Sequence, residues 1–277
     1  MIHILCPVDF SEASLNALDH AVNMCSTCQG ALTLLYVFNA EEFIQVAQTE
    51  ESSQEALHGQ AEIRLKGIVR EIRQSEVAKG IQQVEYIMRV GDLVSSVIDY
   101  AEHHQTTMIV MGTTGVGTLR EAFIGSNTVQ VFEKAPCPVL CVPVAASYSP
   151  VQQIVYATDY ERDDQKIVKQ VVATAKDFGA KVEILHIEKD RSTHKDIQYQ
   201  EYVEKLSSYF MEDSLSFQRE VCEGDVPQCL DHYMNTSQAQ ILALLTHNQN
   251  FLQKLVHKSI AKNLAYFTDS PLLIYKN

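Results

Sequence analysis

Residues 108–127 have the sequence MIVMGTTGVGTLREAFIGSN, and the interpretation of the whole chain starts from them. Residues 109–111 form a short apolar run that stops at Gly112, which predicts a buried strand followed by a glycine-rich loop. Glycine has no Cβ, so a loop that contains Gly112, Gly115 and Gly117 can present its backbone amides to a ligand.

A helix is expected to begin directly after this loop, at residues 125–127. Ser126 is a preferred N-cap residue type, and Val129 and Phe132 continue the stretch with helical spacing. The first amides of a helix lack partners within it and carry the positive end of its dipole. We therefore expect an anion site, and phosphate is the anion that suits it. A tight strand-to-helix connection without a ligand is the alternative explanation of the glycines.

The glycine spacing separates this loop from the common phosphate-binding motifs. Neither Gly-x-x-x-x-Gly-Lys-Ser/Thr nor Gly-x-Gly-x-x-Gly occurs in the chain. The pattern is Gly-x-x-Gly, nine residues and Gly-Ser, formed by Gly112, Gly115, Gly125 and Ser126. This resembles the nucleotide-binding signature of the ATP-binding branch of the universal stress protein family. Further segments resemble that family in the same order: ILCPVDFS at 4–11, LLYV at 34–37, Gly-Asp at 91–92 and APCPVLCV at 135–142.

The resemblance implies a parallel sheet with strand order 3-2-1-4-5 and a nucleotide at the carboxyl ends of strands one and four. It implies that Asp9 and the backbone at Val37 hold the ribose and adenine, and that the glycine loop holds phosphates with Arg120 nearby. An alternative role for Asp9 is to bond the start of the first helix beside Ser11. The nucleotide-binding residues that the resemblance implies are Pro7, Asp9, Val37, Gly112, Gly115, Arg120, Gly125, Ser126 and Asn127.

The composition is typical of a globular protein and excludes some partners. With 277 residues the chain is long for one α/β domain and suits two. A net charge of −13 argues against binding to nucleic acid or an anionic membrane. No apolar run reaches the ~18 residues of a membrane span, and residues 1–8 lack the basic start of a signal peptide. We expect a cytoplasmic protein.

The seven cysteines are scattered, at positions 6, 25, 28, 137, 141, 222 and 229. Cys25 and Cys28 form a Cys-x-x-Cys, for which zinc binding or redox chemistry is the alternative to packing. No second such pair follows, so we expect the cysteines to be free, small apolar side chains in a reducing compartment, with no metal site.

Strand and helix patterns alternate through the first half. Strands are expected over 2–8, 31–37, 82–88, 109–111 and 139–142. The first helix follows Ser11 and has the apolar stripe Leu15, Leu18, Ala21, Val22 and Cys25. Further helices are expected up to about Gln74, after Asp92 and after Ser126. This alternation predicts a parallel sheet covered on both faces.

The same pattern then starts again. Residues 154–160 repeat 4–10, and 184–187 repeat 34–37, both at an offset of 150. Residues 224–225 repeat 91–92, and 270–275 repeat 137–142, both at an offset of 133. The difference of 17 places extra residues between the second and third strands of the first half. We predict two tandem, doubly wound α/β domains, at 1–145 and 151–277, joined by a linker over 143–152.

The second half lacks the glycine signature. Its residues at offset 133 from the signature are Leu245, Asn248, Lys258 and Ser259. Asp159 and Ile187 still match Asp9 and Val37, so a pocket without a phosphate cradle is expected. Lys258 is either solvated or a point charge for an anion.

The chain contains no nucleophile elbow, no His-Glu-x-x-His and no EF-hand loop, so we expect no catalytic residues. The expected function is a stress-linked module that binds ATP or a related adenine nucleotide, with or without Mg²⁺, and acts on a protein partner. Two alternatives stay open. One is a slow ATPase or phosphotransferase that uses Asp9 or Arg120, and the other is a nucleotide-free scaffold for an apolar ligand.

The last strand of each half is apolar, at residues 139–142 and 272–275. A bare apolar edge strand promotes aggregation, so we expect the two strands to pair with each other in an intramolecular pseudo-dimer. Pairing between chains, and thus a further oligomer, is the alternative.

Overall fold

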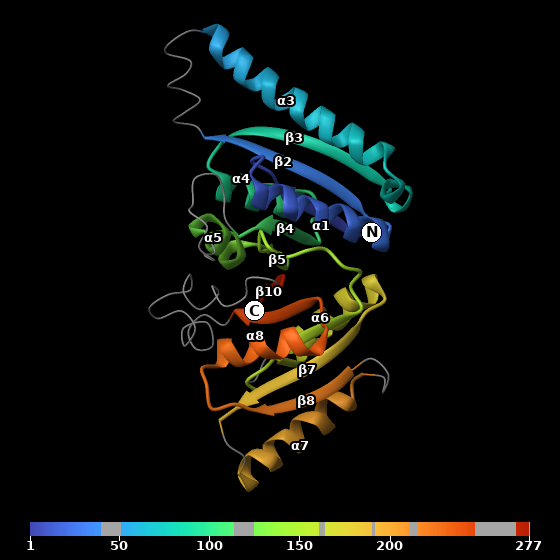
Figure 1. Ribbon diagram of the computed structural model, residues 1–277, viewed down its shortest axis with the longest axis vertical. Coiled ribbons are helices and arrows are strands. Elements are labelled where there is room, and N and C mark those ends of the chain that lie inside the picture. Colours follow the sequence, from blue (N-terminus) through green and yellow to red (C-terminus); the bar gives the residue numbers. More distant parts are fainter. Residues whose placement is uncertain are drawn as a thin grey trace. The chain divides into compact units, whose positions relative to one another are not determined.

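The computed structural model of the protein describes residues 1–39, 51–113, 125–160, 164–189, 192–210, 215–246 and 270–276 (Figure 1). They form two compact units, the first ending at Val144 and the second beginning at Ala145. Some residues singled out in the sequence lie outside the described part: Gly115, Gly117, Arg120, Asn248, Lys258 and Ser259.

The first unit is a parallel sheet with helices. Its described strands are β1 His3–Pro7, β2 Ala31–Asn39, β3 Gln83–Gly91, β4 Met108–Gly112 and β5 Val139–Val142. Its described helices are α1 Glu12–Cys28, α3 Glu51–Gln74, the 3₁₀-helix η1 Glu76–Gly80, α4 Leu93–His103 and α5 Ser126–Lys134. The strand order β3-β2-β1-β4-β5, with parallel pairing, is the predicted order 3-2-1-4-5.

Two strands are longer than the sequence pattern predicted. β2 and β3 pair in register from Ala31 opposite Gln83 to Asn39 opposite Gly91. The prediction ended these strands at 37 and 88, because the side-chain pattern stops there whereas the backbone pairing continues.

Helix α1 packs against β1 and β4, α3 packs against β3, and α4 contacts β2 and α5 (Figure 1). Four of the predicted stripe residues of α1 are buried, namely Leu18, Ala21, Val22 and Cys25. Leu15 is 38% exposed, so its assignment to the stripe is wrong. The buried face is centred on Ala17 and Ala21, and Leu15 lies just beyond its edge.

The second unit repeats this architecture. Its described strands are β6 Gln153–Ala157, β7 Lys181–Glu188, β8 Leu215–Val221, β9 Ile241–Thr246 and β10 Leu272–Lys276. Its described helices are α6 Asp164–Phe178, α7 Thr193–Ser207 and α8 Val226–Ser237. The parallel order β8-β7-β6-β9-β10 is again 3-2-1-4-5.

The repeat extends to individual side chains. The Tyr100 hydroxyl on α4 lies 3.2 Å from Thr33 Oγ1 on β2, and the Tyr233 hydroxyl on α8 donates to Glu183 Oε1 on β7 at 2.5 Å. The tyrosines are 133 residues apart and their partners are 150 apart, as the sequence offsets require. Residues 40–82 connect β2 to β3, whereas 189–214 connect β7 to β8, which places the 17 extra residues where they were predicted.

The cysteines only partly follow the prediction. The Cys25 thiol donates to the Ala31 carbonyl at 3.3 Å, and burial raises the pKa of Cys25, as expected for a packed side chain. Cys222 and Cys229, in contrast, form a disulfide with Cα atoms 6.3 Å apart. The expectation of free thiols is wrong for this pair, because the turn between β8 and α8 brings the two positions together.

The described helices include none that is long and apolar enough to cross a membrane. His, Cys, Asp and Glu side chains do not gather into a metal-binding group in the described part of the chain.

Candidate nucleotide site in the first unit

A cavity of about 310 Å³ opens in the first unit, at the carboxyl ends of adjacent strands β1 and β4. In a doubly wound sheet, this is the point at which the strand order reverses and ligands bind. The cavity is lined by Pro7, Val8, Asp9, Ser14, Val37, Leu93, Met111, Gly112, Thr113, Gly125, Ser126, Asn127 and Thr128. It thus brings together every predicted site residue except Gly115 and Arg120, which lie outside the described residues.

The turn after β1 holds Asp9 at the cavity. Its Oδ1 accepts hydrogen bonds from the Ser11 amide at 3.0 Å and the Ser11 hydroxyl at 2.5 Å. Ser11 in turn caps α1 by accepting from the Ser14 amide at 3.2 Å. Asp9 therefore fulfils its alternative role at the helix start while its side chain also lines the cavity.

Phe10 shapes this turn with a backbone conformation that is rare for an aromatic residue, φ = +62°. Its ring stacks on Tyr36 at 4.9 Å, and the Arg64 guanidinium lies 3.9 Å from the ring centroid. Tyr160 repeats the feature, with φ = +64° and a ring stacked on His186 at 3.9 Å. Sequence reasoning missed this role, although the aromatic pair at offset 150 was a signal for it.

Gly112 is required by packing. A Cβ at this position would lie 2.7 Å from the Ala13 carbonyl oxygen, closer than atoms can approach. The absent side chain lets α1 lie directly on the end of β4. Packing against α1 is therefore sufficient by itself to require glycine at position 112.

Helix α5 begins at the cavity, and its N-cap differs from the prediction. The N-cap is Gly125, with φ = −63° and ψ = +152°, and Ser126 is the first helical residue. The Gly125 amide donates to the Thr113 carbonyl at 2.5 Å, and this bond sets the entry of the chain into the helix. Within the described residues, no side chain caps α5, whereas Ser11 caps α1 and Asp92 caps α4. As far as the described residues go, the first amides of α5 can therefore donate to an anion.

The lining groups suit a ligand with an apolar part and an anionic part. Apolar side chains come from β1, β2, β4 and the start of α4, and hydroxyl and amide groups come from α1, α5 and Thr113. Asp9 is the one ionisable side chain among the described lining residues. The residues that were not predicted are Val8, Ser14, Leu93, Met111, Thr113 and Thr128. Several of them are sequence neighbours of predicted residues, which was the available signal.

The corresponding region of the second unit differs in its side chains. Leu245 occupies the position of Gly112 and is 4% exposed. Thr158 Oγ1 accepts from the Tyr160 amide at 2.9 Å, and the Thr158 carbonyl lies 2.8 Å from Nδ1 of His186, whose pKa is lowered by burial. The predicted match of Asp159 to Asp9 is preserved in the turn after β6.

Comparison with known proteins agrees with this architecture. The model of the universal stress protein family matches residues 1–143 and, a second time, residues 150–276. The chain belongs to the universal stress protein family. It is a tandem member, with one family match in each half.

Among curated relatives, Universal stress protein MJ0531 of Methanocaldococcus jannaschii is 27% identical over 139 residues, which cover 50% of this chain and 80% of that protein. Universal stress protein YxiE of Bacillus subtilis is 25% identical over 144 residues, covering 50% of this chain and 97% of that protein. The crystal structure of a universal stress protein from Archaeoglobus fulgidus covers 99% of this chain and 96% of its own, with a TM-score of 0.71 and 17% identity. This likeness extends the shared fold over both units.

Proposed function

We propose that the first unit binds an adenine nucleotide, ATP or a relative such as AMP, and that the protein acts as a nucleotide-dependent binding module. The observation that carries the proposal is the cavity at the ends of β1 and β4, which is bordered by the uncapped start of α5. The glycine signature of the family's ATP-binding branch supports the choice of nucleotide.

The roles follow from the chemistry of the lining groups. Asp9 accepts hydrogen bonds from ribose hydroxyls, and the apolar surface at Val37 and Pro7 receives the base. The first-turn amides of α5, with the side chains of Ser126 and Asn127, donate to phosphate oxygens. Arg120 and Gly115, which lie outside the described residues, complete the phosphate contacts in this proposal.

Bound phosphates enter a protein whose net charge is −13, so the local donors must overcome an unfavourable field. A Mg²⁺ ion carried with the phosphates would offset part of this charge, because it prefers phosphate and carboxylate oxygens. Comparison of ATP affinity with and without Mg²⁺ tests this part of the proposal.

Binding rather than catalysis fits the observed environment of Asp9. Its Oδ1 is engaged by Ser11 at the start of α1, which is a positioning arrangement. In the alternative, a slow ATPase or phosphotransferase, Asp9 would activate the attacking group. Turnover measured on the wild type and on Asp9→Asn separates the two, because a binding module releases the nucleotide unchanged.

The deciding experiment is release of a bound nucleotide. The purified protein is denatured and deproteinised, and the supernatant is analysed for adenine nucleotides, followed by titration of the emptied protein with ATP and AMP. A nucleotide-free supernatant together with no binding heat would overturn the proposal and favour a scaffold for an apolar ligand. A protein partner and a cytoplasmic location form part of the proposal, and a pull-down with and without ATP tests the partner.

A further inference from the structure

Cys222 and Cys229 join the end of β8 to the start of α8. Cys222 follows the last residue of β8, is half-buried, and donates its amide to the Glu188 carbonyl at 2.8 Å. Cys229 lies four residues after Asp225, the N-cap of α8, and is 7% exposed. Their Cα atoms are 6.3 Å apart, within the range that a disulfide spans.

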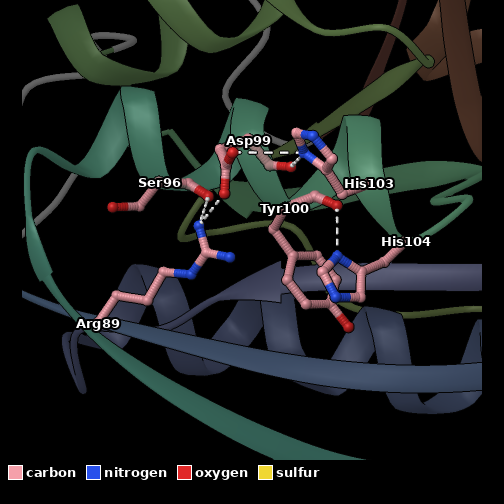
Figure 2. Close-up of polar contacts among 6 residues, drawn as sticks. All are labelled: Arg89, Ser96, Asp99, Tyr100, His103 and His104. Atoms are coloured by element: carbon pink, nitrogen blue, oxygen red, sulfur yellow. Dashed lines mark hydrogen bonds and ion pairs between the residues drawn. The ribbon is translucent and has the colours of Figure 1, made fainter.

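The first unit joins the end of its third strand to the following helix by polar contacts instead. Arg89 lies in β3, three residues before the N-cap Asp92, whereas Cys222 follows the end of β8. Arg89 Nη1 donates to the Ser96 carbonyl at 3.3 Å and pairs with Asp99 Oδ2 at 2.5 Å (Figure 2). The strand end and the following helix are therefore joined in both units, by the contacts of Arg89 in one and by a disulfide in the other.

The N-caps of α4 and α8 also differ between the two units. Asp92 Oδ2 accepts from the Ser95 amide at 2.8 Å and from the Ser95 hydroxyl at 2.9 Å. In the second unit, Gln228 replaces Ser95, and the Asp225 side chain makes no capping bond among the described residues. His232 takes the place of Asp99, so the carboxylate of the first unit's salt bridge is replaced. The disulfide links the end of β8 to the first turn of α8.

Burial lowers the reactivity of four of the other cysteines. It raises the pKa of Cys6 and Cys25 well above the ordinary thiol value, and it raises the pKa of Cys137 and Cys141 to about 12. The thiolate is the form that exchanges with disulfides, so these four thiols react slowly. Cys222 combines partial exposure with a partner cysteine within reach, which none of these four does in the described structure.

We propose that Cys222 and Cys229 are a reversible redox pair that controls the start of α8. The oxidant is a low-molecular-weight disulfide. The Cys222 thiolate attacks one sulfur of it, the S–S bond breaks, and one thiolate leaves and takes up the proton that Cys222 lost. The Cys229 thiolate then attacks the Cys222 sulfur and expels the second thiol, which takes the proton of Cys229. Two cysteines are oxidised, one small disulfide is reduced to two thiols, and exchange with excess thiol reverses the sequence.

The test uses the full chain in buffers of reduced and oxidised glutathione. Alkylation of remaining thiols and mass spectrometry should give a species that carries two fewer alkyl groups than the reduced protein, with Cys222 and Cys229 linked, whose fraction follows the buffer ratio in both directions. Hydrogen exchange should be faster at residues 226–230 in the reduced protein than in the oxidised protein. Residues 93–97 of α4, where the tie is polar, should exchange equally in both states.

Variants define the controls. Cys222→Ser should abolish the linked peptide and the response of α8, whereas Cys137→Ser should leave both unchanged. If Cys222→Ser does not fold, the comparison of reduced and oxidised wild type carries the test. Three results would overturn the proposal: glutathione adducts without the internal bond, a bond that resists the most reducing buffer in the native protein, or equal exchange of α8 in both states. The test involves no nucleotide, so its outcome is separate from that of the nucleotide titrations.

Discussion

A Cβ on Gly112 would lie 2.7 Å from the Ala13 carbonyl oxygen, so the end of β4 and the first turn of α1 are held at a distance that only glycine permits. We predict that Gly112→Ala lowers the free energy of unfolding by about 1–3 kcal/mol, because α1 must move off the strand. Urea unfolding followed by circular dichroism measures the change.

Gly67 is the matched control for this prediction. It lies inside α3, and a Cβ there would meet nothing within 4 Å. Gly67→Ala should raise the free energy of unfolding by about 0.5–1 kcal/mol, because alanine loses less backbone entropy in a helix. Equal effects of the two substitutions would contradict the packing explanation of Gly112.

Gly125 has a different requirement. Its φ of −63° is open to any residue. A Cβ would lie 3.3 Å from the Thr113 carbonyl oxygen and beside the first amides of α5. We predict that Gly125→Val folds, with a loss of about 1 kcal/mol at the N-cap, and no longer binds phosphate. Calorimetric titration with ATP checks this, with Gly59→Ala on α3 as a control that should bind normally.

The number of sites per chain follows from the difference between the units. Leu245 replaces Gly112 in the second unit and is buried, which leaves a phosphate less room there. We predict one nucleotide per chain. Nucleotide at 100 times its dissociation constant should add about 2.7 kcal/mol to the free energy of unfolding, visible as a rise in Tm. Two equivalent sites in a calorimetric titration would show that the second unit binds as well.

The sequence predicted the fold closely because both signals, the apolar runs and the internal repeat, can be found without knowledge of the folded contacts. Alternating apolar runs identify the strands, and the offsets of 150 and 133 locate the repeat without reference to contacts. Strand order came from the resemblance, because nothing in the residues of one strand identifies its neighbour. Helix starts were less certain: Ser126 is a good cap residue type, yet Gly125 takes that place because its amide bonds the Thr113 carbonyl.

The candidate site was predicted through its motif, and what the motif does not contain was missed. The close contact of Gly112 with Ala13 joins residues 99 apart in the sequence, so no local pattern reveals it. Phe10 was visible as a repeated aromatic residue, but its positive φ and its contact with Arg64 arise only in the folded chain. The Cys222–Cys229 disulfide was missed because a separation of seven residues matches no common cysteine motif.

Pairing of the two apolar last strands within one chain stays a prediction from the sequence. It requires no second chain, so light scattering coupled to size-exclusion chromatography should give the mass of one chain at micromolar concentration. Leu140→Lys places a charge at a buried position of β5. If the two last strands belong to one chain, this substitution should lower the free energy of unfolding and leave the mass of the folded protein unchanged. A mass of two chains that persists on dilution would favour the alternative, in which the strands pair between chains.

Asp92 and Asp225 occupy the same N-cap position in the two units, but only the Asp92 side chain bonds its helix, through Ser95. We predict that Asp92→Ala lowers the free energy of unfolding by about 1 kcal/mol at neutral pH and that Asp225→Ala has a smaller effect.

The hydrogen bond from the Ser95 amide lowers the pKa of Asp92. A carboxyl with a lowered folded pKa stabilises the protein above its unfolded pKa, about 3.9, and loses this contribution as the pH falls through the folded value. Urea unfolding of each variant and the wild type at pH 7 and near pH 3 should therefore show the cost of Asp92→Ala shrinking in acid. An equal cost for both variants, unchanged by pH, would mean that the cap bond does not stabilise α4.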